Sequence, residues 1–178
     1  QKGLMMPPGM SFNAVSDKAL AAAKTSTLPK SFWSWEDMLN MNKIGFFPYT
    51  PATQMLHGLA TSIEMLHEEG LDNVFARHDR LAEATRRAVR GWGLEIMCRD
   101  PKYYSPTVTS VLIPDGHDAD AFRSLALDRF NISFGMSFGK FAGKMFRIGH
   151  LGDTNDLMLM GALAGTEMAL ALAGIPHK

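Results

Sequence analysis

The chain opens with the stretch around which its fold and site are organised, Gln1-Lys2-Gly3-Leu4-Met5-Met6-Pro7-Pro8-Gly9. A disordered terminus would be rich in Ser, Glu and Lys. This one instead places a single lysine beside a glycine and three apolar residues, and a rigid Pro-Pro-Gly turn fixes the exit path. The stretch is therefore predicted to be a buried segment, and the sequence is expected to begin inside a longer protein.

Two interpretations of Lys2 are open on the residues alone. Partial burial among Gly3, Leu4 and Met5 would disfavour the ammonium and lower the pKa of the lysine, so that the neutral amine attacks carbonyl groups. Alternatively, the aliphatic stem of Lys2 crosses an apolar surface and the ammonium stays in water.

Length and charge limit the classes of function. With 178 residues, 46% of them hydrophobic and 20% charged, the chain is long enough for one good core and has the composition of a soluble globular protein. Eighteen basic residues balance eighteen acidic ones, so no nucleic acid or anionic membrane surface is indicated as a partner. Any anion that binds must be recognised locally.

Cysteine content and hydropathy indicate a cytoplasmic protein. The single Cys98 forms no internal disulfide, which fits a reducing compartment. No signal peptide is visible. The most apolar run, residues 157–174, is interrupted by Glu167 and three glycines, and it is interpreted as a core helix instead of a membrane span.

The first part of the chain is predicted to be mainly helical. Ser16 is placed to cap a helix, and Thr50 and Pro51 are an N-cap and a first helical residue. Leu56, Leu59, Ile63 and Leu66 repeat at helical spacing, so one face of that helix is expected to be buried. The predicted elements are a strand over 10–15 and helices over 17–25, 36–42 and 51–69, with Gly70 just past the end.

The second part alternates helices with short strands, which is typical of a small α/β sandwich. A boundary is predicted near Gly70, giving domains 1–70 and 71–178. The predicted helices cover 71–91, 119–130 with Asp118 as its cap, and 154–173. The predicted strands cover 94–97, 108–113, 132–134 and 145–149.

Arg147 stands alone in an apolar strand, where an unpaired guanidinium would be costly. It therefore needs an anion. A carboxylate of the chain, Asp153 or Asp156, would satisfy it structurally. A substrate carboxylate, held through two parallel hydrogen bonds, would satisfy it functionally. Both possibilities stay open at this point.

Other candidate groups have a structural and a functional interpretation. Tyr49 and Thr50 would stand at a helix N-terminus, which favours a phosphate, although Thr50 would equally serve as a cap. The aromatic cluster over residues 32–35 indicates a core or a subunit interface. His78 and His150 are expected to be partnered structural histidines, although His150 would also fit beside Arg147. No Cys or second His lies at metal-binding distance in sequence from His78, so no metal is predicted.

Four stretches, in order along nearly the whole chain, together resemble the serine-glyoxylate and alanine-glyoxylate aminotransferases. They are Gln1-Lys2-Gly3-Leu4-Met5 with Pro7-Pro8-Gly9 and Ser16-Asp17-Lys18-Ala19, then Phe47-Pro48-Tyr49-Thr50-Pro51, then Ala76-Arg77-His78 running to Gly91-Trp92-Gly93-Leu94, and finally Phe146-Arg147-Ile148-Gly149-His150-Leu151-Gly152.

The resemblance implies a pyridoxal phosphate (PLP) enzyme of fold type I and class V that transfers an amino group from serine, or alanine, to glyoxylate. It implies that 1–70 end a large PLP-binding domain and that 71–178 form a small α/β domain. Its lysine, Lys2, would carry the cofactor, while Gln1, Tyr49 and Thr50 would bind the cofactor phosphate, the last two across a homodimer interface. Arg147 would hold the carboxylate of the amino or 2-oxo acid. The alanine-glyoxylate branch has a tyrosine where this chain has Phe47.

Two alternatives to this function are considered. The chain could be a non-enzymatic module that binds a small carboxylate through Arg147 or mediates dimerisation. It could also belong to another fold type I PLP enzyme, such as a lyase.

Overall fold

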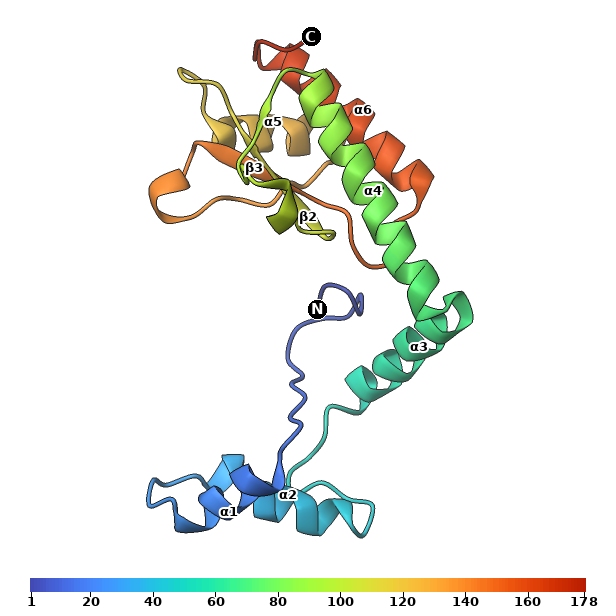
Figure 1. The fold of residues 1–178 in the computed structure, drawn as a ribbon, viewed down its shortest axis with the longest axis vertical. Coiled ribbons are helices and arrows are strands. Elements are labelled where there is room, and N and C mark those ends of the chain that lie inside the picture. The colour runs from blue at the N-terminus through green and yellow to red at the C-terminus, as the bar shows by residue number, and fades with distance from the viewer. The chain divides into compact units, whose positions relative to one another are not determined.

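The structure is a computed structural model that describes residues 1–178 (Figure 1). It contains two compact units. We call the first, Gln1 with Met6–Ser62, the helical unit, and the second, Lys2–Met5 with Ile63–Lys178, the α/β unit. The assignment of 1–70 and 71–178 to two domains of a fold type I enzyme stays a prediction.

The helical unit contains α1 (Asp17–Thr25), α2 (Trp35–Asn42) and the first part of α3 (Thr53–Glu69). A 3-10 turn, Ser31–Trp33, precedes α2. The predicted cap of α1 is confirmed, because the hydroxyl oxygen of Ser16 accepts the Ala19 N–H at 3.3 Å. Ser34 caps α2 in the same way, so these two helices begin where a side-chain oxygen satisfies a free backbone N–H.

The helical unit has almost no core. Within it only Ser62 is buried, and the large apolar side chains of the 32–35 cluster are exposed, Phe32 by 57% and Trp33 by 75%. The predicted strand over 10–15 is wrong, because a strand needs a neighbour for its hydrogen bonds and every regular element of this unit is helical. The prediction that the aromatic cluster over residues 32–35 belongs to a core is also wrong, because its aromatic side chains are exposed. Its interpretation as a subunit interface stays a prediction.

The start of α3 differs from the prediction. The Pro51 carbonyl accepts the Thr53 N–H at 3.0 Å in a tight turn, so the first helical hydrogen bond goes from Leu56 to Ala52. Thr50 is therefore not the N-cap, and helix α3 begins at Thr53. The predicted buried face is also wrong, since Ile63 is 41% exposed and Leu56, Leu59 and Leu66 are half-buried. Gly70 follows the last helical residue as predicted.

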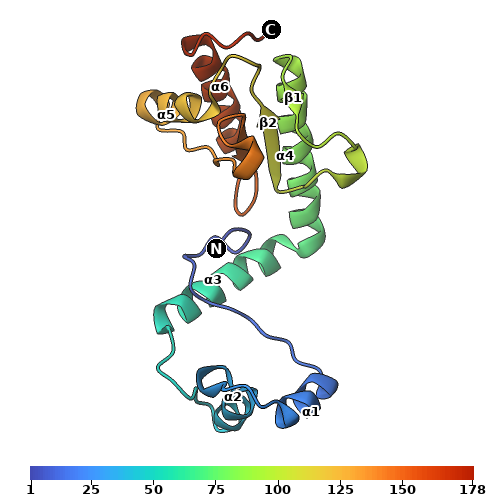
Figure 2. The same cartoon turned by 90° about the vertical axis from the view of Figure 1, so that its left-hand side faces the viewer.

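The α/β unit is a three-stranded antiparallel sheet with helices packed on it (Figures 1 and 2). The strand order is β1-β2-β3, with α4 packing on β1 and β2, α5 on β3, and α6 against both helices. The elements are α4 (Leu71–Gly91), β1 (Glu95–Ile96), β2 (Val108–Leu112), α5 (Ala119–Phe130), β3 (Met145–Gly149) and α6 (Asp156–Leu172), with 3-10 turns at Pro101–Tyr103 and Gly139–Phe141.

Local signals place these elements where the sequence predicts them. Helix α4 has the predicted bounds. Asp118 caps α5 by accepting the N–H groups of Asp120 and Ala121 at 2.7 and 3.3 Å. Helix α6 begins at Asp156, capped by Asn155, and is the predicted core helix. The predicted strand over 132–134 is wrong, because this segment joins the sheet only through an isolated bridge between Gly135 and Arg147.

The two faces of the sheet differ in burial. Val111 of β2 pairs with Phe146 of β3, and both are buried beneath the helices. Side chains alternate across a strand, so Ser110 and its partner Arg147 lie on the opposite face, and both are half-buried. The register of β3 therefore puts Arg147 outside the core.

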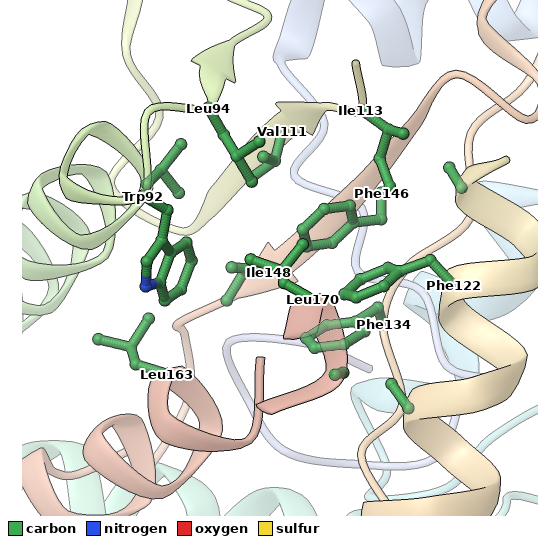
Figure 3. Packing of buried hydrophobic residues seen from close by; sticks show 14 of the residues in the cluster. Trp92, Leu94, Val111, Ile113, Phe122, Phe134, Phe146, Ile148, Leu163 and Leu170 are labelled. Atoms are coloured by element: carbon green, nitrogen blue, oxygen red, sulfur yellow. The ribbon is translucent and has the colours of Figure 1, made fainter. Parts of the chain in front are cut away.

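An aromatic cluster forms the centre of the core (Figure 3). The ring centroids of Phe122, Phe134 and Phe146 are 4.7 to 5.6 Å apart. Burying each such side chain contributes about 1.5–3 kcal/mol. None of the helices is both long and apolar enough to cross a membrane.

Candidate functional site

Arg147 is held on one edge of its guanidinium only. Its Nε donates to the Met136 carbonyl at 2.9 Å, and its guanidinium carbon lies 5.5 Å from the centre of the Phe138 ring. Gly135 permits this arrangement, because a Cβ there would lie 3.1 Å from the Cβ and the Nε of Arg147. The two terminal nitrogens of Arg147 have no acceptor in the chain, so they are free to bind an anion.

The acidic residues that could have neutralised Arg147 lie elsewhere. Asp156 pairs with Arg80 at 3.1 Å, and Asp153 lines a cavity beside Arg77. Arg147 itself forms no ion pair with any carboxylate of the chain. The structural alternative considered for Arg147 is therefore wrong in this chain.

Lys2 lies in a tight turn of the α/β unit. The Met5 N–H donates to the Lys2 carbonyl at 2.9 Å, and Met5 has a φ of +55°. Lys2 is exposed and forms no ion pair. The predicted burial of this stretch is wrong here, because no element of the chain covers the lysine. What remains is an accessible primary amine without a carboxylate partner.

Arg77 fixes the turn that follows β3. Its Nε and Nη2 donate to the two carboxylate oxygens of Glu69 at 2.6 and 2.7 Å, and its Nη1 donates to the carbonyls of Gly152 and Thr154 at 2.8 and 2.9 Å. These hydrogen bonds lower the pKa of Glu69 and raise the pKa of Arg77. This role of Arg77 is not predictable from the sequence, since its partners lie up to 77 residues away in the chain.

His78 and His150 are structural, as expected. His78 Nδ1 donates to the Val74 carbonyl at 2.7 Å, and its Nε2 accepts the Gly152 N–H at 3.2 Å. His150 is fully buried, where its Nδ1 donates to the Pro106 carbonyl at 3.1 Å and its Nε2 accepts the Thr109 hydroxyl at 2.9 Å. Burial lowers the pKa of His150 and keeps the imidazole neutral.

The remaining predicted residues lie in the helical unit. Gln1, Tyr49 and Thr50 are all exposed. The ring of Tyr49 lies 4.8 Å from that of Phe32, and Thr50 stands three positions before the first residue of α3. Their predicted contacts with a cofactor phosphate stay predictions.

Comparison with known proteins gives the family. No family model matches the chain. The serine-glyoxylate aminotransferase of Hyphomicrobium methylovorum is 51% identical over 180 aligned positions, which cover 100% of this chain and 44% of that protein. The chain belongs to the class V aminotransferase family. Another member, the L-aspartate-glyoxylate aminotransferase of Paracoccus denitrificans, is 42% identical over 99% of the chain and 44% of its own length.

A solved structure of the family has the same fold. The pyridoxamine-pyruvate aminotransferase of Mesorhizobium loti superposes with a TM-score of 0.90 at 33% identity, covering 98% of this chain and 46% of that one. The α/β chain is thus part of a fold type I aminotransferase structure. It spans about half the length of the relatives that it matches.

Proposed function

We propose that the chain is the lysine-bearing, C-terminal part of a PLP-dependent aminotransferase that transfers the amino group of serine, or alanine, to glyoxylate. The products are glycine and hydroxypyruvate, or pyruvate. Identity of 51% to a serine-glyoxylate aminotransferase over the whole chain supports this assignment. The structural observation that carries it is the guanidinium of Arg147, which has two free terminal nitrogens and no carboxylate partner.

The residues present fit the chemistry that PLP requires. Lys2 has an accessible primary amine without an ion-pair partner, and this amine would hold the aldehyde group of PLP. Gln1, Tyr49 and Thr50 carry the polar hydrogens that a phosphate accepts. When bound, PLP supplies an electron sink for the substrate carbon that loses a proton.

Two residues of the chain would perform the remaining tasks. Arg147 would bind the carboxylate of the amino or 2-oxo acid through its terminal nitrogens and so orient the substrate. Lys2 would act as the general base and general acid that moves the proton at the substrate α-carbon. The proposal includes a cytoplasmic homodimer in which Tyr49 and Thr50 reach the phosphate of the neighbouring subunit.

The proposal is tested on Lys2 in the full-length protein. Borohydride reduction in the presence of PLP, followed by peptide mass spectrometry, should place the cofactor label on Lys2. Lys2→Ala should abolish both the label and transamination, whereas Lys18→Ala, which removes an exposed lysine of α1, should change neither. A label on another lysine, or an active Lys2→Ala enzyme, would refute the assignment.

An isotope experiment separates the alternative functions. Serine labelled with nitrogen-15, incubated with glyoxylate, should yield labelled glycine if the enzyme is a transaminase. A lyase would release products without labelling glycine. A carboxylate-binding module would bind the substrates without any cofactor label on Lys2.

A further inference from the structure

We propose that Arg77, held by Glu69, is a positioning residue for Lys2: it fixes Gly152, the residue against which the Lys2–Met5 turn packs. This inference rests on the proposed function of Lys2 as the cofactor lysine. Arg77 makes no hydrogen bond to Lys2, and it acts through the backbone of the turn after β3.

Arg77 is bound tightly enough to define a position. Its side chain is only 14% exposed and makes four hydrogen bonds, two to Glu69 and two to backbone carbonyls. The paired bonds to the Glu69 carboxylate fix the plane of the guanidinium. Its Nη1 is thereby aimed at the carbonyls of Gly152 and Thr154. The pair thus ties the junction of α3 and α4 to the turn after β3.

Gly152 is held on three sides. Its N–H donates to His78, its carbonyl accepts from Arg77, and its third side faces the Lys2–Met5 turn. A Cβ at Gly152 would lie 2.9 Å from the Met5 Cγ and 3.4 Å from the Lys2 carbonyl oxygen, and its φ is +77°. Only glycine meets both conditions. A shift of Gly152 therefore moves the surface on which the lysine turn rests.

The lysine turn depends on this surface. Met5 has a φ of +55°, a backbone conformation that is costly for a residue with a side chain and persists only where the surroundings impose it. Met5 lines a cavity of about 340 Å³ together with Arg77, Glu69, Gly152 and Asp153. If Gly152 is held less firmly, the Lys2–Met5 turn should adopt other backbone conformations, and the position of the Lys2 amine should become less well defined.

The same turn is continuous with the strand that carries Arg147. Strand β3 ends at Gly149, three residues before Gly152. The Arg77 contacts therefore hold the end of β3 as well as the lysine turn. Placing both groups against one fixed turn is what the proposed reaction requires, because misplacing a reacting group by about 1 Å costs roughly a hundredfold in rate.

The experiment compares Arg77→Gln and Glu69→Gln with Arg80→Gln in the full-length protein. Arg80 is the matched control, because it lies one helical turn further along α4 and pairs with Asp156 at the surface. Hydrogen exchange is measured without cofactor. The peptide that contains Met5 should exchange about tenfold faster in the first two variants, while the peptide covering α5, which neither Arg77 nor Glu69 contacts, exchanges as in the wild type. General destabilisation would accelerate both peptides.

A second measurement links the exchange to the cofactor. The rate at which PLP forms its borohydride-reducible link to Lys2 should fall by roughly tenfold to a hundredfold in Arg77→Gln and Glu69→Gln, and stay unchanged in Arg80→Gln. Gly152→Ala, which displaces Met5 but leaves Arg77 in place, should reproduce both effects if an Arg77 variant fails to fold.

The outcomes separate the two proposals. If Lys2 of the wild type carries no label, the proposed function fails and this inference fails with it. If Lys2 is labelled but the Met5 peptide exchanges at the wild-type rate in Arg77→Gln and Glu69→Gln, only this inference is overturned. Equal effects in Arg80→Gln would overturn it as well.

Discussion

Replacing Arg147 by alanine tests the carboxylate-binding role directly. The side chain has one hydrogen bond within the chain, from Nε to the Met136 carbonyl, and its terminal nitrogens are free. The variant therefore removes a substrate contact while breaking a single bond at the edge of the sheet. Arg129→Ala is the matched control, because Arg129 is an exposed arginine of α5 without an ion pair.

The expected loss follows from the bonds that become unavailable. A hydrogen bond to a charged group contributes about 1.5–3 kcal/mol. Two parallel bonds to one carboxylate, which are not fully additive, should contribute about 3–4 kcal/mol. At 1.4 kcal/mol per factor of ten, kcat/KM for serine should fall roughly a hundredfold to a thousandfold. Arg147→Lys keeps the charge but loses the planar fork, so it should recover only part of this loss.

The assay is a double-mutant cycle between the enzyme and the substrate. Serine and ethanolamine differ by the carboxylate, so the half-reaction of each is measured with the wild type and with Arg147→Ala. If Arg147 binds the carboxylate, the wild type prefers serine strongly and the variant loses most of that preference. The coupling energy should again be about 3–4 kcal/mol.

Two outcomes would contradict a carboxylate-binding role of Arg147. If Arg147→Ala slows serine and ethanolamine by the same factor, the coupling is zero and Arg147 does not bind the substrate carboxylate. A loss of the same size in Arg129→Ala would point to a general effect of removing positive charge.

Two further predictions concern stability. Hydrogen bonds from Arg77 lower the pKa of Glu69 from its ordinary value of 4.5, so the pair stabilises the fold above that pH, and this stabilisation is lost as the pH falls through the lowered pKa. Urea unfolding of the full-length protein at a series of pH values should show this loss of stability in acid for the wild type and a smaller loss for Glu69→Gln. Equal dependence on pH in the two proteins would contradict the prediction. Phe146 is fully buried against both Phe122 and Phe134, so Phe146→Ala should lower the free energy of unfolding by about 3–5 kcal/mol in the same assay. A loss below about 1 kcal/mol would show that this core is not packed as described.

The α/β unit was predictable because its local signals agree with its packing. The Asp118 cap, the bounds of α4 and the apolar run of β3 are all readable from neighbouring residues, and the surfaces that cover them belong to the same chain. The burial of the helical unit was not predictable in this way. Apolar periodicity along α3 predicts a buried face, but it does not say that the burying surface lies within the 178 residues. The positions of the helices in this unit are therefore close to those predicted, whereas the predicted burial of their side chains is wrong.

Long-range polar contacts were not predictable. The Arg77 bonds to Glu69 and Gly152 span a helix junction and 75 residues of chain, and no spacing in sequence specifies either. The prediction that Thr50 caps helix α3 is wrong for a different reason. Thr-Pro is a good helix start, but the Pro51 carbonyl accepts the Thr53 N–H in a tight turn, and the first helical hydrogen bond is made only at the Ala52 carbonyl.

Arg147 is unpaired although other arginines of the α/β unit have acidic partners. Arg77 and Arg80 take Glu69 and Asp156, and three further arginines of α4 converge on Glu83. Acidic partners are thus available in this unit, and β3 presents Arg147 on the face away from them. The contact with Met136 and the Phe138 ring holds the guanidinium at little cost while it is partly in water. A guanidinium fixed in this way loses little entropy when a carboxylate binds, so its isolation from carboxylates of the chain favours binding of one from a substrate.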